Sequence, residues 1–230
     1  MTWGYENSLT IILAFVAFII TMVAQININI NYSKYQKRKN KKGYTGQEIA
    51  RKILDANGLK DVYVVETRGT LTDHYDPTRK VIRLSSNIYN GQTIASASVA
   101  AHECGHAIQD KVGYTFMKIR SFLVPIVNFI SYLGYFSLII SIFAGVTGYI
   151  KLCILILVAT LIFQLVTLPV EFDASKRGLS ELQKLNLIES DEVGSARKML
   201  WSAALTYVAS LASTILNVLR LLIMLKDNDD

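Results

Sequence analysis

The sequence predicts a mostly α-helical membrane protein, with about four transmembrane helices and a small α+β domain in the cytoplasm. Of its 230 residues, 51% are apolar and only 18% are charged, whereas soluble proteins have about 25% charged residues. Because a helix needs about 20 mostly apolar residues to cross a bilayer, a long uncharged stretch can hold one span. Four such stretches occur, at residues 7–33, 121–150, 152–170 and 199–219. This composition excludes a purely soluble enzyme and a disordered chain.

The distribution of basic residues predicts the side of the membrane on which the polar segments lie. Residues 34–120 and 171–198 together carry 21 of the 24 Lys and Arg residues. With four spans, both segments fall on the same side, and short cytoplasmic segments carry the excess of Lys and Arg. We therefore expect a multi-pass protein of the cell membrane whose polar domain faces the cytoplasm.

A basic tract at residues 34–42 contains six Lys and Arg residues. Such a tract can bind nucleic acid, or it can rest on anionic lipid headgroups and anchor the topology. Because it directly follows the first predicted span, at 9–30, the anchor is the favoured interpretation. The lipid bilayer is then its partner, and we expect no nucleic acid.

The segment 43–120 has the signals of a small folded domain. Thr45 and Glu48 have the spacing of a capping box that begins a helix, and Gly58 is placed to end that helix. Residues 62–66 and 80–84 are rich in β-branched side chains and predict two strands of a small antiparallel sheet. A helix capped by Thr93 is expected at about 93–110.

The remaining segments predict a membrane hairpin and a return to the membrane. The hairpin spans 122–168, with a tight loop from Gly145 to Lys151, and Pro169 is expected to close its second helix. Residues 171–198 predict a cytoplasmic helical segment. The segment 200–225 is either a fourth span or an interfacial helix, because Arg220 lies within it.

The strongest motif is His102-Glu103-Cys104-Gly105-His106, an H-E-x-x-H pattern on the helix at 93–110. Residues four apart share one helix face, so both imidazoles can bind one Zn²⁺ ion. Glu103 is offset by one residue, which suits a base that acts on metal-bound water. The alternative is two histidines on a helix face with satisfied hydrogen bonds.

A catalytic zinc site usually has three protein ligands and a water molecule, so a third ligand is needed. Glu171 directly follows the membrane hairpin, which returns it to the side of the motif helix. Asp173 and His74 are the alternatives, and an ordinary interfacial carboxylate is the non-functional interpretation of Glu171. The sequence therefore predicts a site for one zinc ion.

The motif, the hairpin after it and residues 171–175 (Glu-Phe-Asp-Ala-Ser) resemble the membrane-anchored gluzincin metallopeptidases. These include the bacterial heat-shock membrane protease and the CAAX prenyl endoproteases. The chain is more closely similar, over nearly its whole length, to the bacterial YugP-type neutral zinc metallopeptidases. This resemblance implies a zincin-like domain and an active site that faces the cytoplasm, with His102, His106 and Glu171 as metal ligands and Glu103 as the base.

The sequence departs from the wider clan at one position. Many members have Asp four residues after the ligand Glu, where it orients a ligand histidine, but this chain has Ser175. Either Ser175 or Asp173 is then expected to support a ligand histidine, and such support tunes metal affinity.

These residues predict an integral membrane zinc endopeptidase that hydrolyses peptide bonds at or near the cytoplasmic membrane surface through a metal-activated water. Its substrate would be a peptide or a membrane protein. The oxyanion of the reaction needs a further donor, for which His74, Tyr75 and Tyr89 are candidates. The strand at 80–84 is either an edge that pairs with an extended peptide or a strand that only packs against the motif helix.

Two other functions are compatible with the motif. An intramembrane metalloprotease would place the motif helix inside the bilayer, but residues 91–111 are too polar for exposure to lipid. A catalytically inactive, zinc-stabilised scaffold would have a closed site with four protein ligands, formed by His102, His106, Glu171 and His74. Neither the substrate nor the oligomeric state follows from the sequence.

Overall fold

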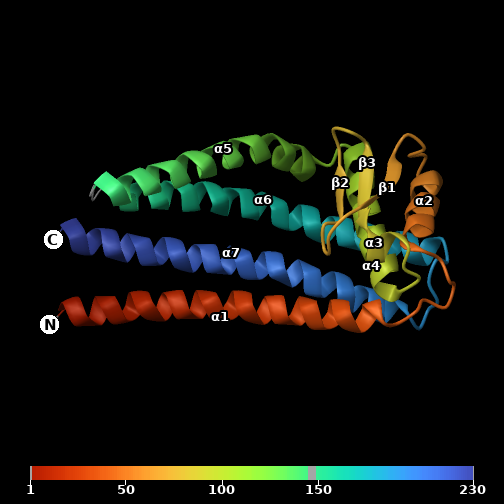
Figure 1. Ribbon diagram of the computed structural model, residues 1–230, viewed down its shortest axis with the longest axis horizontal. Helices are drawn as coiled ribbons and strands as arrows, with labels where there is room; N and C mark the ends of the chain where they lie inside the picture. Colours follow the sequence, from red (N-terminus) through yellow and green to blue (C-terminus); the bar gives the residue numbers. More distant parts are fainter. Residues whose placement is uncertain (1, 145–148, 230) are drawn as a thin grey trace. The chain divides into compact units, whose positions relative to one another are not determined.

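The computed structural model describes residues 2–144 and 149–229 (Figure 1). The expected loop from Gly145 to Lys151 therefore lies mostly outside the described residues. By its internal contacts the chain divides into two compact units, the first formed by Met1–Gln25, Ile119–Leu168 and Thr206–Asp230, and the second by Ile26–Lys118 and Pro169–Leu205. The elements are α1 (Thr2–Gln36), α2 (Gly46–Ala56), β1 (Tyr63–Thr67), β2 (His74–Asp76), β3 (Val81–Ser85), α3 (Ser86–Tyr89), α4 (Ile94–Lys111), α5 (Thr115–Ala144), α6 (Tyr149–Lys184) and α7 (Val193–Asp229).

The first unit consists of long apolar helices. Among the described residues, four helices are long and apolar enough to cross a membrane, at Ser8–Gln36, Thr115–Gly134, Ile150–Lys184 and Val193–Lys226, and a part of each lies in this unit. Large apolar side chains such as Phe15 and Phe122 are exposed, as expected of surfaces that contact lipid. Within this unit Gln164 Nε2 on α6 donates to Ser210 Oγ on α7 at 3.0 Å. The predicted fold class, a mostly α-helical membrane protein with a small α+β domain, is confirmed.

The sheet of the second unit has the order β1-β3-β2. β1 pairs with β3 in parallel, with Tyr63 opposite Val81, and β2 pairs with β3 in antiparallel fashion, with Tyr75 opposite Ile82. The expected antiparallel pairing of the strands at 62–66 and 80–84 is wrong, because the chain reverses through β2, which occupies the other side of β3. Since β3 is central and both its sides are paired, it is not an edge strand for a peptide either.

The core of the second unit forms where α2 and α4 pack together. The capping box is confirmed: the Thr45 hydroxyl accepts from the Glu48 N–H at 3.2 Å, and the Glu48 carboxylate accepts from the Thr45 N–H at 2.8 Å. Gly58 follows the end of α2 with a φ of +65°, in the left-handed region that favours glycine. The fully buried side chains in this core include Ile49, Ile53, Leu54, Ala97, Ala100 and Ala101.

The basic tract after α1 is part of the fold of this unit. The buried carboxylate of Glu192 accepts hydrogen bonds from the backbone N–H groups of Lys41 and Glu189, both at 2.9 Å. The side chains of Lys41 and Lys42 pair with Asp191 and Glu189, at 2.7 and 2.8 Å. Two of the six cations expected to face lipid headgroups are therefore already paired with protein carboxylates.

α6 continues through Pro169 instead of ending there, so the expected end of the second hairpin helix is wrong. Proline removes one helical hydrogen bond, but the residues after it pack closely against α4. A Cβ on Gly105 would lie 2.2 Å from the Ala174 carbonyl oxygen, and a Cβ on Gly178 would lie 2.5 Å from that of Ala101. Two backbones in such close contact stabilise the helical continuation, which carries Glu171 to α4.

Candidate metal centre

The two histidines of the motif project from one face of α4. The helix begins at Thr93, whose hydroxyl accepts from the Ser96 N–H at 3.1 Å. The rings of His102 and His106 meet edge to face, with their centroids 4.7 Å apart. His106 is buried, and the His102 side chain is 17% exposed. One face of α4 therefore presents two imidazoles to a single point, with limited access from solvent.

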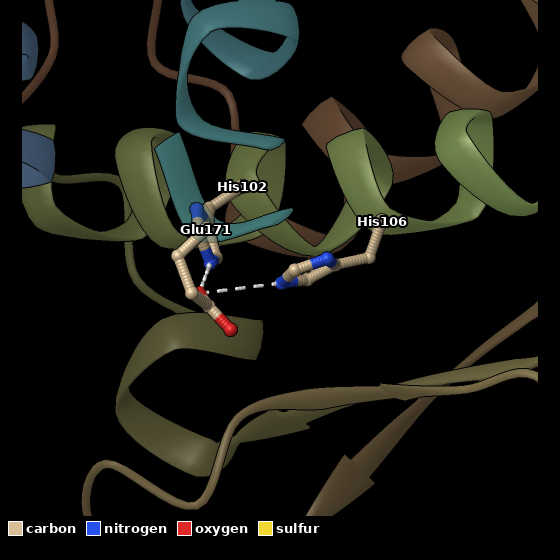
Figure 2. Close-up of side chains that lie close together, drawn as sticks. All are labelled: His102, His106 and Glu171. Carbon is tan, nitrogen blue, oxygen red and sulfur yellow. Dashed lines mark ion pairs between the residues drawn. The ribbon is translucent and has the colours of Figure 1, made fainter. Parts of the chain in front are cut away.

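Glu171 completes this group from α6 (Figure 2). Its Oε2 lies 3.2 Å from His102 Nε2 and 3.6 Å from His106 Nε2, and the carboxylate is 2% exposed. The candidate ligand atoms of the three residues all lie within 4.8 Å of one another. The structure thus brings together the three side chains that the sequence singled out, although 65 residues separate His106 from Glu171.

A buried glutamine determines the tautomer of the second histidine. Gln109 Nε2 donates to the Val170 carbonyl at 2.8 Å and to Asp173 Oδ2 at 2.9 Å. Its Oε1 is therefore the atom that lies 3.0 Å from His106 Nδ1, so this nitrogen must be the donor. The Nε2 lone pair of a neutral His106 then faces the Glu171 carboxylate. Two such electron-rich atoms attract each other when a metal ion or a proton lies between them, so the arrangement is compatible with metal binding.

The first histidine has a different partner. His102 Nδ1 lies 3.0 Å from Ser175 Oγ, whereas Asp173 reaches His106 only through Gln109. Of the two residues that the sequence left open, Ser175 contacts a histidine directly, whereas Asp173 is linked to the other histidine only through Gln109. Sequence reasoning missed Gln109, whose position three residues after His106 on the same helix was the available signal.

The donor set fits a zinc ion. Two imidazole nitrogens and one carboxylate oxygen are the protein ligands of many catalytic zinc sites, which keep a fourth position for water. With ligand distances of about 2.1 Å, tetrahedral ligand atoms lie about 3.4 Å apart, close to the observed 3.2 and 3.6 Å. His74 lies outside the cluster, because its ring is exposed and its Nδ1 lies 2.8 Å from the Thr72 carbonyl oxygen. The closed set of four ligands is therefore not assembled.

Glu103 is a buried carboxylic acid beside this cluster, only 6% exposed. Burial raises the pKa of Glu103 to about 7, and the negative charges of Glu171 and Asp73 act in the same direction. The charge of His102 and a hydrogen bond from the Tyr75 backbone N–H oppose this rise in the pKa. A carboxyl group with a pKa near neutrality is suited to both accept and release a proton.

The three candidate oxyanion donors lie in different surroundings. The Tyr75 hydroxyl donates to Asp110 Oδ2 at 2.7 Å, which Lys80 Nζ also contacts at 2.6 Å. Tyr89 packs against the hydrophobic core. His74 bonds within its own loop, as described above. The Tyr75 hydroxyl is therefore already engaged, and the neighbouring N–H of Tyr75 is the group that contacts the site.

Comparison with known proteins places the whole chain in one family. Residues 10–226 match a family described as "Putative neutral zinc metallopeptidase". The chain is 41% identical over 222 residues to the "Putative membrane protease YugP" of Bacillus subtilis (strain 168), a match that covers 96% of this chain and 99% of the relative. No solved structure matches the chain.

Proposed function

Because the chain belongs to the family described as "Putative neutral zinc metallopeptidase", we propose that it is an integral membrane zinc endopeptidase. It would hydrolyse peptide bonds at or near the cytoplasmic surface of the cell membrane. The observation that carries the proposal is the convergence of His102, His106 and Glu171 within 4.8 Å, beside the buried carboxyl group of Glu103. Its substrate is a peptide or a membrane protein.

In this mechanism His102, His106 and Glu171 would hold one Zn²⁺ ion. A zinc ion bound there supplies a Lewis acid and lowers the pKa of its water. Glu103 takes the proton of the attacking water and delivers it to the leaving amine. Gln109 holds the His106 ring so that Nε2 faces the ligand point, and its contact with His106 Nδ1 is 3.0 Å. Such partners of ligand histidines contribute to metal affinity.

The surroundings of α4 favour this function over the two alternatives. α4 packs against α2 and against the sheet, in the unit that carries most of the polar chain. This packing supports cleavage outside the bilayer, in contrast to an intramembrane protease. A zinc-stabilised scaffold would use a closed site, and the fourth ligand that it needs, His74, is directed to its own loop.

The test separates metal binding from catalysis in the full-length protein. Glu103→Gln is expected to keep zinc and fold but to lose proteolysis, whereas Glu171→Ala is expected to lower the zinc bound per chain. Glu66→Gln makes the same chemical change at an exposed position and serves as the control. Zinc is measured by elemental analysis, and cleavage by comparing the membrane proteins of cells that carry each form. Equal cleavage by Glu103→Gln would reject the role of Glu103, and unchanged zinc in Glu171→Ala would reject its role as a ligand.

A further inference from the structure

A groove of about 510 Å³ lies between α6 and α7 in the second unit, and neither the proposed metal ligands nor Glu103 line it. Its walls are mostly apolar, and two basic side chains also line it. The lining residues that matter are Phe172, Lys176, Leu179, Arg197, Leu200 and Trp201.

One end of the groove is aromatic and close in sequence to the membrane spans. The rings of Phe172 and Trp201 contact each other, with centroids 5.5 Å apart, and Trp201 is 55% exposed. Phe172 follows the end of an uncharged stretch by two residues, and Trp201 lies at the start of the next one. Exposed tryptophan is typical of the membrane–water interface.

The other end of the groove is polar. Ser180 and Gln183 line it on α6 and Arg197 lines it on α7. From Phe172 to Gln183 the helix rises about 16 Å, at 1.5 Å per residue. The groove therefore changes from apolar to polar along this length, as a phospholipid does from its acyl chain to its headgroup.

The two cations that line the groove are Lys176 and Arg197. Lys176 and Arg197 are exposed, and within the part of the chain that the structure describes neither forms an ion pair or a hydrogen bond. By contrast, the neighbouring Arg177 pairs with Asp173 at 2.5 Å. Two unpaired cations beside an apolar wall attract an anion that carries a hydrocarbon chain.

We infer that this groove binds an anionic glycerophospholipid. Its acyl chain lies against Phe172, Leu200 and Trp201, and its phosphate lies between Lys176 and Arg197. A neutral lipid would leave both cations unpaired, and a soluble acidic peptide would leave the aromatic end exposed to water. The inference does not depend on the proposed peptidase activity, because none of these five side chains is a proposed metal ligand or the proposed base. Ser175, which contacts His102, also lines the groove but makes no contact that the inference uses.

Trp201 itself can report on the bound lipid. The chain has two tryptophans, Trp3 and Trp201, so Trp3→Phe leaves Trp201 as the sole tryptophan. This full-length variant is reconstituted into phosphatidylcholine bilayers that contain either brominated phosphatidylglycerol or brominated phosphatidylcholine at the same mole fraction. Bromine quenches tryptophan on contact, so brominated phosphatidylglycerol is expected to quench Trp201 more strongly.

Charge removal tests where that preference arises. The double variant Lys176→Gln, Arg197→Gln is expected to abolish the preference for phosphatidylglycerol. Each charge removed should lower the association constant of phosphatidylglycerol relative to phosphatidylcholine about fivefold. Lys184→Gln with Lys198→Gln removes two exposed cations of the same helices that do not line the groove, and should keep it. Circular dichroism and zinc content of each variant verify the fold, and they separate a failure here from a failure of the metal site.

Four outcomes would overturn the inference. The first is equal quenching by the two brominated lipids, and the second is a preference that survives the groove variant. The third is displacement of phosphatidylglycerol by a soluble acidic peptide, which would identify a peptide as the occupant. A preference lost in both double variants would mean general attraction by surface charge, and would also reject the groove.

Discussion

Gly178→Ala tests whether the close contact between α4 and α6 sets the geometry of the metal centre. The new Cβ would lie 2.5 Å from the Ala101 carbonyl oxygen and 3.0 Å from the His102 backbone nitrogen, whereas ordinary contacts begin at 3.4 Å. The helices must therefore separate by about 0.9 Å at this point, the difference between 3.4 and 2.5 Å. Zinc–ligand distances tolerate only about 0.2 Å. Because His102 is on α4 and Glu171 is on α6, separation of the two helices moves the ligands apart, and we expect the zinc dissociation constant to rise about 10- to 100-fold.

The effect of Gly178→Ala on the free energy of unfolding distinguishes packing from helix propensity, because the two act in opposite directions. Glycine to alanine inside a helix stabilises it by about 1 kcal/mol, whereas overpacking costs about 1–3 kcal/mol. At Gly178 the overpacking should dominate and lower the free energy of unfolding. Gly194→Ala is the matched control, because a Cβ at Gly194 meets nothing within 4 Å.

The assay is competition for zinc with a chelator of known affinity, together with thermal unfolding in detergent. Gly194→Ala should bind zinc like the wild type and be equally or more stable. If Gly178→Ala bound zinc as tightly as Gly194→Ala and unfolded at the same temperature, close helix packing would not be what positions Glu171.

Two further predictions concern buried polar groups. Gln109→Leu removes the acceptor for His106 Nδ1 and should weaken zinc binding about 10- to 100-fold. Competition with a chelator measures the zinc affinity, and Gln47→Leu, at an exposed position, is the control. Equal affinities of the two variants would exclude Gln109 as a positioning residue. Burial raises the pKa of Asp73 although Ser85 donates two hydrogen bonds to it, at 2.6 and 3.2 Å. The folded chain thus holds the Asp73 proton to a higher pH than the unfolded chain. Asp73 therefore lowers the free energy of unfolding as pH rises from the ordinary Asp pKa, about 3.9, through the pKa of the folded state. Asp73→Asn should flatten that slope in pH-dependent thermal unfolding, and an unchanged slope would contradict the assignment.

Local features of this protein could be predicted because short stretches of sequence determine them. The capping box of Thr45 and Glu48 needs only one helical turn, and the shared face of His102 and His106 needs only helical periodicity. The apolar stretches likewise predict membrane helices from length and composition alone. Glu171 lies close to both histidines, as expected if a hairpin of two spans returns the chain to the same side, and its role as a metal ligand stays a prediction.

The features that the sequence left open or predicted wrongly depend on contacts between distant segments. The strand at 80–84 has the same residues whether it is central or at an edge, and only the position of β2 decides this. A proline inside a helix usually ends or kinks it, yet α6 continues through Pro169, stabilised by the close packing of Gly178 against α4. The contact of Ser175 with His102 follows from the packing of α6 against α4, and the same packing brings Val170 and Asp173 to the Gln109 amide, which orients it toward His106. The sequence by itself determined which residues could bind a metal, because that depends on chemistry and local spacing. Only the tertiary structure decided how they are oriented, because that depends on packing energies summed over elements far apart in the chain.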